Sequence, residues 1–376
     1  MALSMLVRPI NPNTTSVIQS NLKFQVNFND FPVYLSSIDR STVKTTKLLF
    51  SALPNLRRRA SLNLQRLMAS ASPSATDEVL KLATFVIGEE ETQVGVVRHG
   101  YIWPLKQVLN SSQNISAAHI SEMSDVISHW HLLYNCIKFE GPGIKLENVK
   151  LLAPIPKPHG AIICIGKNYA DHVKEVDTWK TAPDITSPSI PKYPIVFTKA
   201  PQSVIGPGAA IVYPQAITTQ VDYETELAVI IGKSGHCIKR EDAISHVFGY
   251  TILNDVTARD LQKKHQQWFM GKSCDTFCPM GPWIVPATEI NGEDLQIQCW
   301  VNGELRQNGR TSDMIFSIPE LIETISSGIT LQPGDIIATG TPSGVGSGFN
   351  PPRHLVPGDS ICMKIEGIGE LNNHII

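Results

Sequence analysis

Three things are scarce in this sequence: long apolar runs, net charge and closely spaced cysteines. No stretch approaches the roughly 18 consecutive apolar residues of a membrane-spanning helix, which argues against a membrane protein. The formal net charge is −2 over 376 residues, so the chain lacks the basic character with which proteins bind nucleic acid. The 7 cysteines are scattered, and an odd, scattered set favours a reducing compartment over a disulfide framework.

Acidic residues are also scarce in the first 76 residues. This segment has nine Lys or Arg but only Asp30 and Asp39 as acids, and it is rich in Ser, Thr, Asn and Leu. Such a composition is typical of an organelle transit peptide. We therefore predict that residues 1–76 are a mitochondrial transit peptide or a disordered extension. A cytoplasmic protein, or one whose true start is Met68, is the alternative.

Two folded parts are expected after this extension. Residues 78–150 combine three strand-like segments with a helical pattern over about residues 118–139, which predicts a small N-terminal β/α module. Residues 153–160 hold three prolines and a glycine, as a linker would. Residues 153–376 carry mostly strand signals, including a hairpin turn at Asn302-Gly303, and predict a β-rich α+β catalytic domain.

Two carboxylates stand side by side in QVDYETELAVIIG, residues 220–232. On a strand, Glu224 and Glu226 point to the same face, and burying both in ionised form costs on the order of several kcal/mol each. Either one carboxyl stays protonated or a cation sits between them. Asp255 ends a second apolar strand, and three carboxylates suit a hard dication such as Mg²⁺. The alternative is an edge strand with a solvated acidic face.

A histidine and a glutamate are spaced three apart in CIGKNYADHVKE, residues 164–175. On a helix, His172 and Glu175 are neighbours on one face, and a carboxylate beside an imidazole orients it and raises its basicity. This pattern is that of a general base. The alternative is an exposed ion pair without a catalytic role.

Polar and cationic residues follow in residues 254–282 and 336–346. Arg259, Gln262 and Lys272 would neutralise an anionic substrate near the carboxylates, although Arg259 could instead form a structural salt bridge with Asp260. In the Gly-rich segment IIATGTPSGVG, the Thr341 hydroxyl and the backbone N–H groups could cradle a carboxylate or enolate oxygen. A plain tight turn explains this segment equally well.

Five segments, in this order and spacing, resemble the fumarylacetoacetate hydrolase superfamily: GKNYADHVKE, VDYETELAVIIGK, TILNDVTARDLQ, GKSCDTFCPMGP and ATGTPSGVG. Residues 80–150 and the closing segment PPRHLVPGDSICMKIEGIGEL resemble one branch of this superfamily, the proteins called fumarylacetoacetate hydrolase domain-containing protein 2. The resemblance implies a mixed β roll or partial barrel, an active-site cleft and a homodimer.

The resemblance also implies roles for single residues. Mg²⁺ or Mn²⁺ would be held by Glu224, Glu226 and Asp255. His172 and Glu175 would form a dyad on a lid over the metal, and Lys272 would be the active-site lysine. Arg259, Gln262 and Thr341 match substrate-contacting positions.

Substrates of this superfamily share a 2-oxo acid group that binds the metal and passes through an enolate. We therefore predict an oxaloacetate tautomerase, in which His172 and Glu175 move the proton at C3 and Lys272 holds the enolate oxygen. Oxaloacetate decarboxylation and acylpyruvate C–C hydrolysis use the same enolate and remain alternatives. A non-catalytic binding module is a remote alternative, because the set of chemically active residues is complete.

Overall fold

The computed structural model describes residues 24–28, 31–35, 79–109, 120–139, 141–177 and 190–376. The chain divides into two compact units, Met1–Ser72 and Pro73–Ile376. In the first unit, β1 (Phe24–Phe28) pairs antiparallel with β2 (Phe31–Leu35). The rest of residues 1–76 lies outside the described residues, so their role in targeting stays a prediction. None of the helices in the described ranges has the length and apolar character to cross a membrane.

The larger sheet of the second unit has, within the described residues, 12 strands. Their spatial order is β6-β5-β4-β3-β16-β14-β13-β19-β8-β9, with β7 beside β3 and β10 beside β16. The strands are β3 (Lys81–Val86), β4 (Gln93–Arg98), β5 (Tyr101–Pro104), β6 (Ile144–Lys145), β7 (Lys150–Leu151), β8 (Ile162–Gly166), β9 (Ile195–Lys199), β10 (Val204–Ile205), β13 (Thr225–Ile231), β14 (Val247–Asn254), β16 (Cys278–Pro286) and β19 (Ile336–Ala338). Because β3 pairs with β16, the predicted N-terminal module and catalytic region share one sheet.

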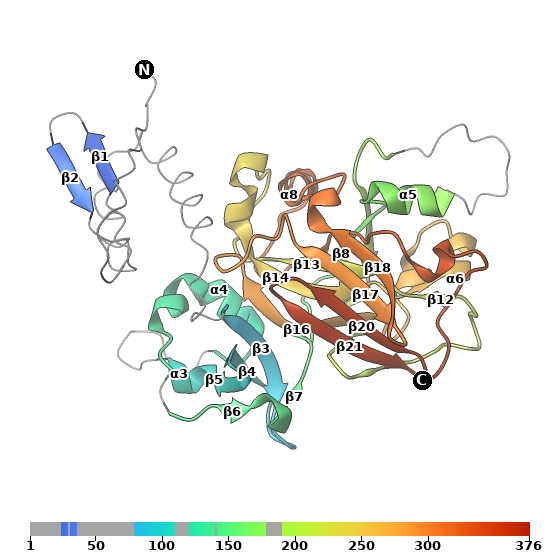
Figure 1. Ribbon diagram of the computed structural model, residues 1–376, viewed down its shortest axis with the longest axis horizontal. Helices are drawn as coiled ribbons and strands as arrows, with labels where there is room; N and C mark the ends of the chain where they lie inside the picture. Colours follow the sequence, from blue (N-terminus) through green and yellow to red (C-terminus); the bar gives the residue numbers. More distant parts are fainter. Residues whose placement is uncertain (1–23, 29–30, 36–78, 110–119, 140, 178–189) are drawn as a thin grey trace, which may run out of the picture. The chain divides into compact units, whose positions relative to one another are not determined.

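A second sheet of 5 described strands has the order β11-β21-β20-β17-β18, and Figure 1 shows β17, β20 and β21 side by side. These strands are β11 (Ala210–Ile211), β17 (Gln296–Val301), β18 (Glu304–Arg310), β20 (Ser360–Ile365) and β21 (Gly369–Ile375). The predicted hairpin is present: Asn302 and Gly303 have φ values of 52° and 79°, as a two-residue turn with left-handed backbone requires. A small antiparallel pair joins β12 (Val221–Asp222) to β15 (Thr257–Ala258).

Helices are short and lie between the strands. Those in the described residues are α3 (Leu105–Val108), α4 (Met123–Leu133), α5 (Ala170–Asp177), α6 (Arg259–Lys264), α7 (Phe269–Lys272) and α8 (Ile318–Ser326). Single 3₁₀ segments are η2 (Tyr134–Cys136), η3 (Leu146–Asn148), η4 (Pro201–Ser203), η5 (Arg240–His246), η6 (Thr311–Asp313) and η7 (Gly346–Gly348). The helix predicted over about residues 118–139 is α4, extended by η2.

The core lies on both faces of β13, the strand between β14 and β19. Leu227, Val229 and Ile231 pack in one cluster with side chains of the five-stranded sheet and α8. Ala228 and Ile230 pack in the other cluster, which includes apolar residues of α4. Period-2 alternation therefore buries every residue of this strand, as its unbroken apolar sequence requires. The predicted β-rich α+β fold is confirmed.

The segments that carry the candidate site residues meet at one edge of the larger sheet. Parallel strands β8 and β19 end there, antiparallel β13 begins there, and β14 ends opposite the start of β13, with Thr225 paired to Asn254. The segments that leave or enter these strand ends therefore meet at this edge. They are the loop into α5, the approach to β13, the residue after β14 and the loop after β19.

Candidate active site

Three carboxylates converge at this sheet edge. Glu224, Glu226 and Asp255 are 5%, 1% and 0% exposed, and each offers an oxygen within 4.8 Å of the other two. An edge strand with a solvated acidic face is thereby excluded. The expectation of one continuous strand through both glutamates is wrong in detail, because Glu224 lies in the break between β12 and β13. There its N–H donates to the Asn254 side chain, and its carbonyl accepts from the Asp255 N–H.

Cationic side chains hold these carboxylates. The Lys272 ammonium donates to Glu224 at 2.9 Å and to Asp255 at 2.6 Å. Arg259, the first residue of α6, binds Glu224 through Nη1 at 2.6 Å and Asp222 through Nε at 2.9 Å. Arg259 thus pairs with the buried carboxylates of Asp222 and Glu224. The partner considered from the sequence was the neighbouring Asp260.

The ionisation of the two glutamates differs. Burial alone would raise the pKa of Glu224, but Lys272 and Arg259 beside it bring this pKa below its ordinary value. Burial, Asp255 and Glu224 raise the pKa of Glu226 well above its ordinary value, and its carboxylate accepts a hydrogen bond from the Gly340 N–H at 2.9 Å. Without an added cation, Glu226 is therefore the carboxyl that resists ionisation.

The donor set fits a divalent metal ion. Buried carboxylates in this cluster belong to Asp222, Glu224, Glu226 and Asp255, and buried cations to Lys199, Arg259 and Lys272. With four acids against three bases, the fully ionised cluster carries one excess negative charge. Hard oxygen ligands with an excess of negative charge are what Mg²⁺ or Mn²⁺ prefers. A dication would favour ionised Glu226 and complement an anionic substrate.

His172 and Glu175 form the dyad expected from their spacing on α5. The side chains are 7% and 14% exposed, and His172 Nδ1 lies 3.1 Å from Glu175 Oε2. This burial excludes an ordinary surface ion pair. Because a carboxylate can only accept, Nδ1 donates and Nε2 is the nitrogen left to take up a proton. His172 lines the same cavity as the two glutamates.

The loop after β19, residues 339–348, donates hydrogen bonds from its backbone N–H groups. The acceptors are carboxylates of the chain itself. Gly340 donates to Glu226, Gly344 to Glu175, and Gly346 and Ser347 to Asp222. The segment is therefore more than the plain turn that the sequence allowed. Thr341 Oγ1 accepts a hydrogen bond from Gln307 Nε2 at 2.8 Å. The hydroxyl lines the cavity and can therefore donate its own proton to a bound substrate.

These groups surround a cavity of about 340 Å³. Of the nine residues singled out from the sequence, seven line it, namely His172, Glu224, Glu226, Arg259, Gln262, Lys272 and Thr341. Glu175 and Asp255 lie behind the lining, bonded to His172 and Lys272. The structure thus brings the whole set together, and the catalytic roles of its members stay predictions.

Aromatic rings close one side of the cavity. Phe197 and Trp268 meet edge to face with centroids 5.1 Å apart, and Lys272 Nζ lies 5.0 Å from the Phe197 centroid. The Trp268 ring packs directly on Gly166, where a Cβ would come within 2.4 Å of it. This apolar wall lowers the local dielectric and strengthens the interactions of the charged groups.

Sequence reasoning missed two charged residues of the site. Lys199, fully buried at the end of β9, donates to Asp255 at 2.7 Å and to the carbonyls of Val256 and Lys272. Asp222, also fully buried, holds Arg259. A lysine closing the apolar segment PIVFT and a third acid next to the glutamate pair were the signals available in the sequence.

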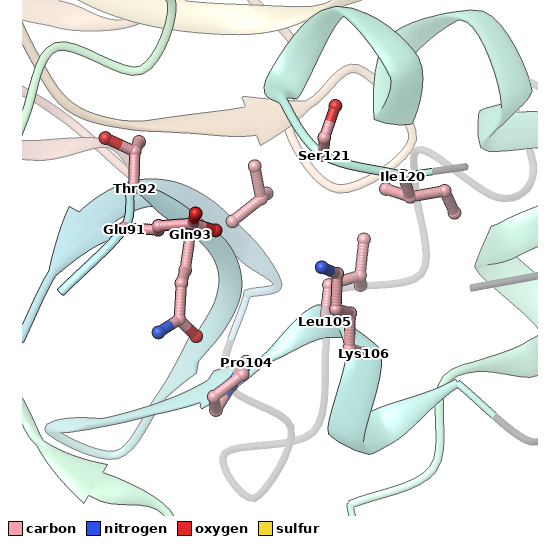
Figure 2. A pocket seen from close by; sticks show the side chains of 9 residues that line it. Glu91, Thr92, Gln93, Pro104, Leu105, Lys106, Ile120 and Ser121 are labelled. Atoms are coloured by element: carbon pink, nitrogen blue, oxygen red, sulfur yellow. The ribbon is translucent and has the colours of Figure 1, made fainter. Parts of the chain in front are cut away.

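A second cavity, of about 280 Å³, lies among β4, β5 and the segment before α4. Figure 2 shows Glu91, Thr92 and Gln93 on one side of it, Leu105 and Lys106 across from them, and Ser121 and Ile120 on the third segment. Its charged side chains, Glu91 and Lys106, are exposed. The buried ionisable groups expected at a catalytic site therefore favour the first cavity.

Comparisons with known proteins show the family of this chain. Residues 161–376 match the family model "Fumarylacetoacetate (FAA) hydrolase C-terminal". Oxaloacetate tautomerase YisK of Bacillus subtilis is 58% identical over 231 residues, 61% of this chain and 74% of that protein. The mitochondrial oxaloacetate tautomerase FAHD2B of Bos taurus is 42% identical over 238 residues, 62% of this chain and 72% of that protein. The solved structure of fumarylacetoacetate hydrolase from Exiguobacterium antarcticum is 40% identical, with a TM-score of 0.65 over 79% of this chain and 99% of that chain. The chain therefore belongs to the fumarylacetoacetate hydrolase family of enzymes.

Proposed function

We propose that this protein is a divalent-metal-dependent tautomerase that interconverts the keto and enol forms of a 2-oxo dicarboxylic acid, with oxaloacetate as its substrate. The observation that carries the proposal is one cavity lined by Glu224 and Glu226 of the acidic set and by His172 of the buried His–Glu dyad, with Asp255 and Glu175 behind the lining. The tautomerase names of the Bacillus subtilis and Bos taurus relatives support the choice of substrate.

Glu224, Glu226 and Asp255 would hold the metal ion, Mg²⁺ or Mn²⁺. The chemistry that such an ion supplies is Lewis-acid polarisation of the 2-oxo group, which acidifies the C3 hydrogens. Arg259 and Lys272 line the cavity beside these carboxylates and add positive charge that favours a dianionic substrate and its enolate. Gln262 and Thr341 offer hydrogen bonds that orient the substrate.

His172 would move the proton. With Nδ1–H bonded to Glu175, the free Nε2 can take a proton from C3, and the electron pair of the broken C–H bond passes into the enolate. Return of the same proton to the enolate oxygen yields the enol, and the reverse sequence yields the ketone. No bond between carbons breaks and no water is consumed. Trp268 and Phe197 keep one side of the site apolar, which limits water access.

The test uses the purified full chain with Mg²⁺ and enol-oxaloacetate. Enol absorbance and pyruvate formation are followed in parallel, before and after removal of metal with a chelator. We expect metal-dependent enol loss without pyruvate. Stoichiometric pyruvate would identify a decarboxylase and overturn the proposal. Silence in both channels would overturn it as well, and acylpyruvates would be the substrates to try next.

Location and assembly remain predictions alongside this function. The basic, acid-poor composition of residues 1–76 is the reason to expect a mitochondrial protein, and the relative from Bos taurus is named as mitochondrial. The expected homodimer rests on resemblance to the family.

A further inference from the structure

The Glu175 carboxylate sits in a socket made by the loop after β19. Its Oε1 accepts from the Gly344 N–H at 2.9 Å, while its Oε2 binds His172. Gly348 lies against the same carboxylate, and a Cβ there would lie 1.8 Å from Oε1 and 2.1 Å from Cδ of Glu175. The carboxylate therefore occupies the space that any side chain at position 348 would need.

This loop is anchored independently of the dyad. Asp222 accepts from the N–H groups of Gly346 and Ser347 at 2.7 and 2.9 Å. The same carboxylate holds Arg259, whose Nη1 binds Glu224. Tyr223 adds a bond from its hydroxyl to the Gly344 carbonyl at 2.8 Å. One short loop thus connects the residues proposed to hold the metal with the residue that orients His172.

We propose that this socket positions the catalytic histidine: Gly348 and the Gly344 N–H set the Glu175 carboxylate, and Asp222 sets the socket relative to Glu224. Gly348 is then a positioning residue, which acts through Glu175 and not by touching substrate. The proposal rests on the proposed function for its kinetic consequence, whereas the geometry of the socket is independent of the reaction.

The first variant is Gly348→Ala. Its backbone is outside the left-handed region, so the backbone accepts alanine, and the atoms that must move are Cγ, Cδ and Oε1 of the Glu175 side chain. We expect kcat to fall about 10- to 100-fold, since a displacement near 1 Å can cost that much, with KM and metal-dependent thermal stabilisation nearly unchanged. The matched control is Gly328→Ala, where a Cβ meets nothing within 4 Å, and its kcat should stay within twofold.

A second variant separates positioning from general damage. Glu175→Asp shortens the side chain by one methylene and draws the carboxylate away from position 348. Combined with Gly348→Ala, it should recover at least about fivefold of the lost kcat, because the two changes act on one contact. Strictly additive losses in the double variant, or a Gly348→Ala protein with wild-type kcat, would overturn the proposal.

Hydrogen exchange keeps the two proposals distinguishable. If the wild-type protein fails to tautomerise oxaloacetate, the proposed function fails, and the socket is judged on the amides of α5 alone. Gly348→Ala should speed their exchange about tenfold or more, and Gly328→Ala should not, because only the first displaces the Glu175 side chain from its hydrogen bond with the Gly344 N–H. Equal protection of α5 in both variants would overturn the socket.

Discussion

Two cavities of similar volume, about 340 and 280 Å³, differ in the groups that surround them. The first is lined by ionisable side chains that are themselves buried, among them Glu224, Glu226 and Lys272. The second (Figure 2) is lined by exposed Glu91 and Lys106 and by the buried apolar residues Val94, Leu105 and Ile120. Burying charge is costly unless it is compensated. The difference teaches that the convergence of compensated charges, and not cavity size, indicates a catalytic site.

Of the changes proposed for the two cavities, Glu226→Gln should have the largest effect on metal-dependent stability and on activity. Because Glu226 resists ionisation, a neutral side chain of the same shape should leave the free energy of unfolding of the metal-free protein unchanged or raise it. Stabilisation by Mg²⁺ should disappear, and activity should fall beyond the roughly 10- to 100-fold losses typical of changes next to metal ligands. Thermal unfolding with and without Mg²⁺, together with the enol assay, measures both effects.

The comparison variant is Glu224→Gln. This change takes one carboxylate partner from Lys272 and from Arg259, which keep Asp255 and Asp222, and should destabilise the metal-free protein by about 1–3 kcal/mol. If both variants destabilised the metal-free protein equally, the assigned difference between the two glutamates would be wrong.

Changing His172 to Ala should have the next largest effect, and one confined to proton transfer. We expect kcat to fall about 10²- to 10⁴-fold, because a positioned general base contributes that much. Stabilisation by Mg²⁺ should persist, since the three carboxylates stay in place. The control is His374→Ala, an exposed histidine on β21, and this variant should keep full activity. Full turnover in the His172 variant would rule out its role as the base.

The smallest expected effect lies beside the second cavity. Asp125 accepts N–H bonds from Ser121 and Glu122 at 2.8 and 3.1 Å near the start of α4; burial raises its pKa, but these bonds lower it below the ordinary value overall. Asp125→Asn should reduce the free energy of unfolding at pH 7 by about 0.3–1 kcal/mol, the usual value of a charge at a helix N-terminus. Activity should stay within twofold.

The pH dependence follows from the sign of that shift. A depressed pKa stabilises the folded state at pH values above the unfolded pKa, and the contribution is lost as pH falls through the folded value. The wild-type protein should therefore lose slightly more stability than Asp125→Asn between about pH 5 and pH 3. Denaturant unfolding at several pH values tests this, with Glu147→Gln, which removes an exposed carboxylate, as the control. Parallel curves for wild type and Asp125→Asn would contradict the assigned role.

Local spacing in the sequence was enough to predict several contacts. His172 and Glu175 meet because residues three apart share a helix face, and Asn302-Gly303 turns a hairpin because both accept positive φ. The convergence of Glu224 and Glu226 with Asp255 followed from acids at the ends of apolar strands. The break that places Glu224 outside β13 was not predictable, since it depends on the Asn254 side chain of the neighbouring strand.

By itself, the sequence determined which chemical groups are present, which of them are neighbours within one helix or turn, and which strands must be buried. Only the tertiary structure decided which charges compensate one another. Lys199 reaches Asp255 across 56 residues, and the Gly344 N–H reaches Glu175 across 169. Such contacts depend on strand order and loop path, which are settled by packing of the whole core, whereas helix and strand periodicity acts only between near neighbours.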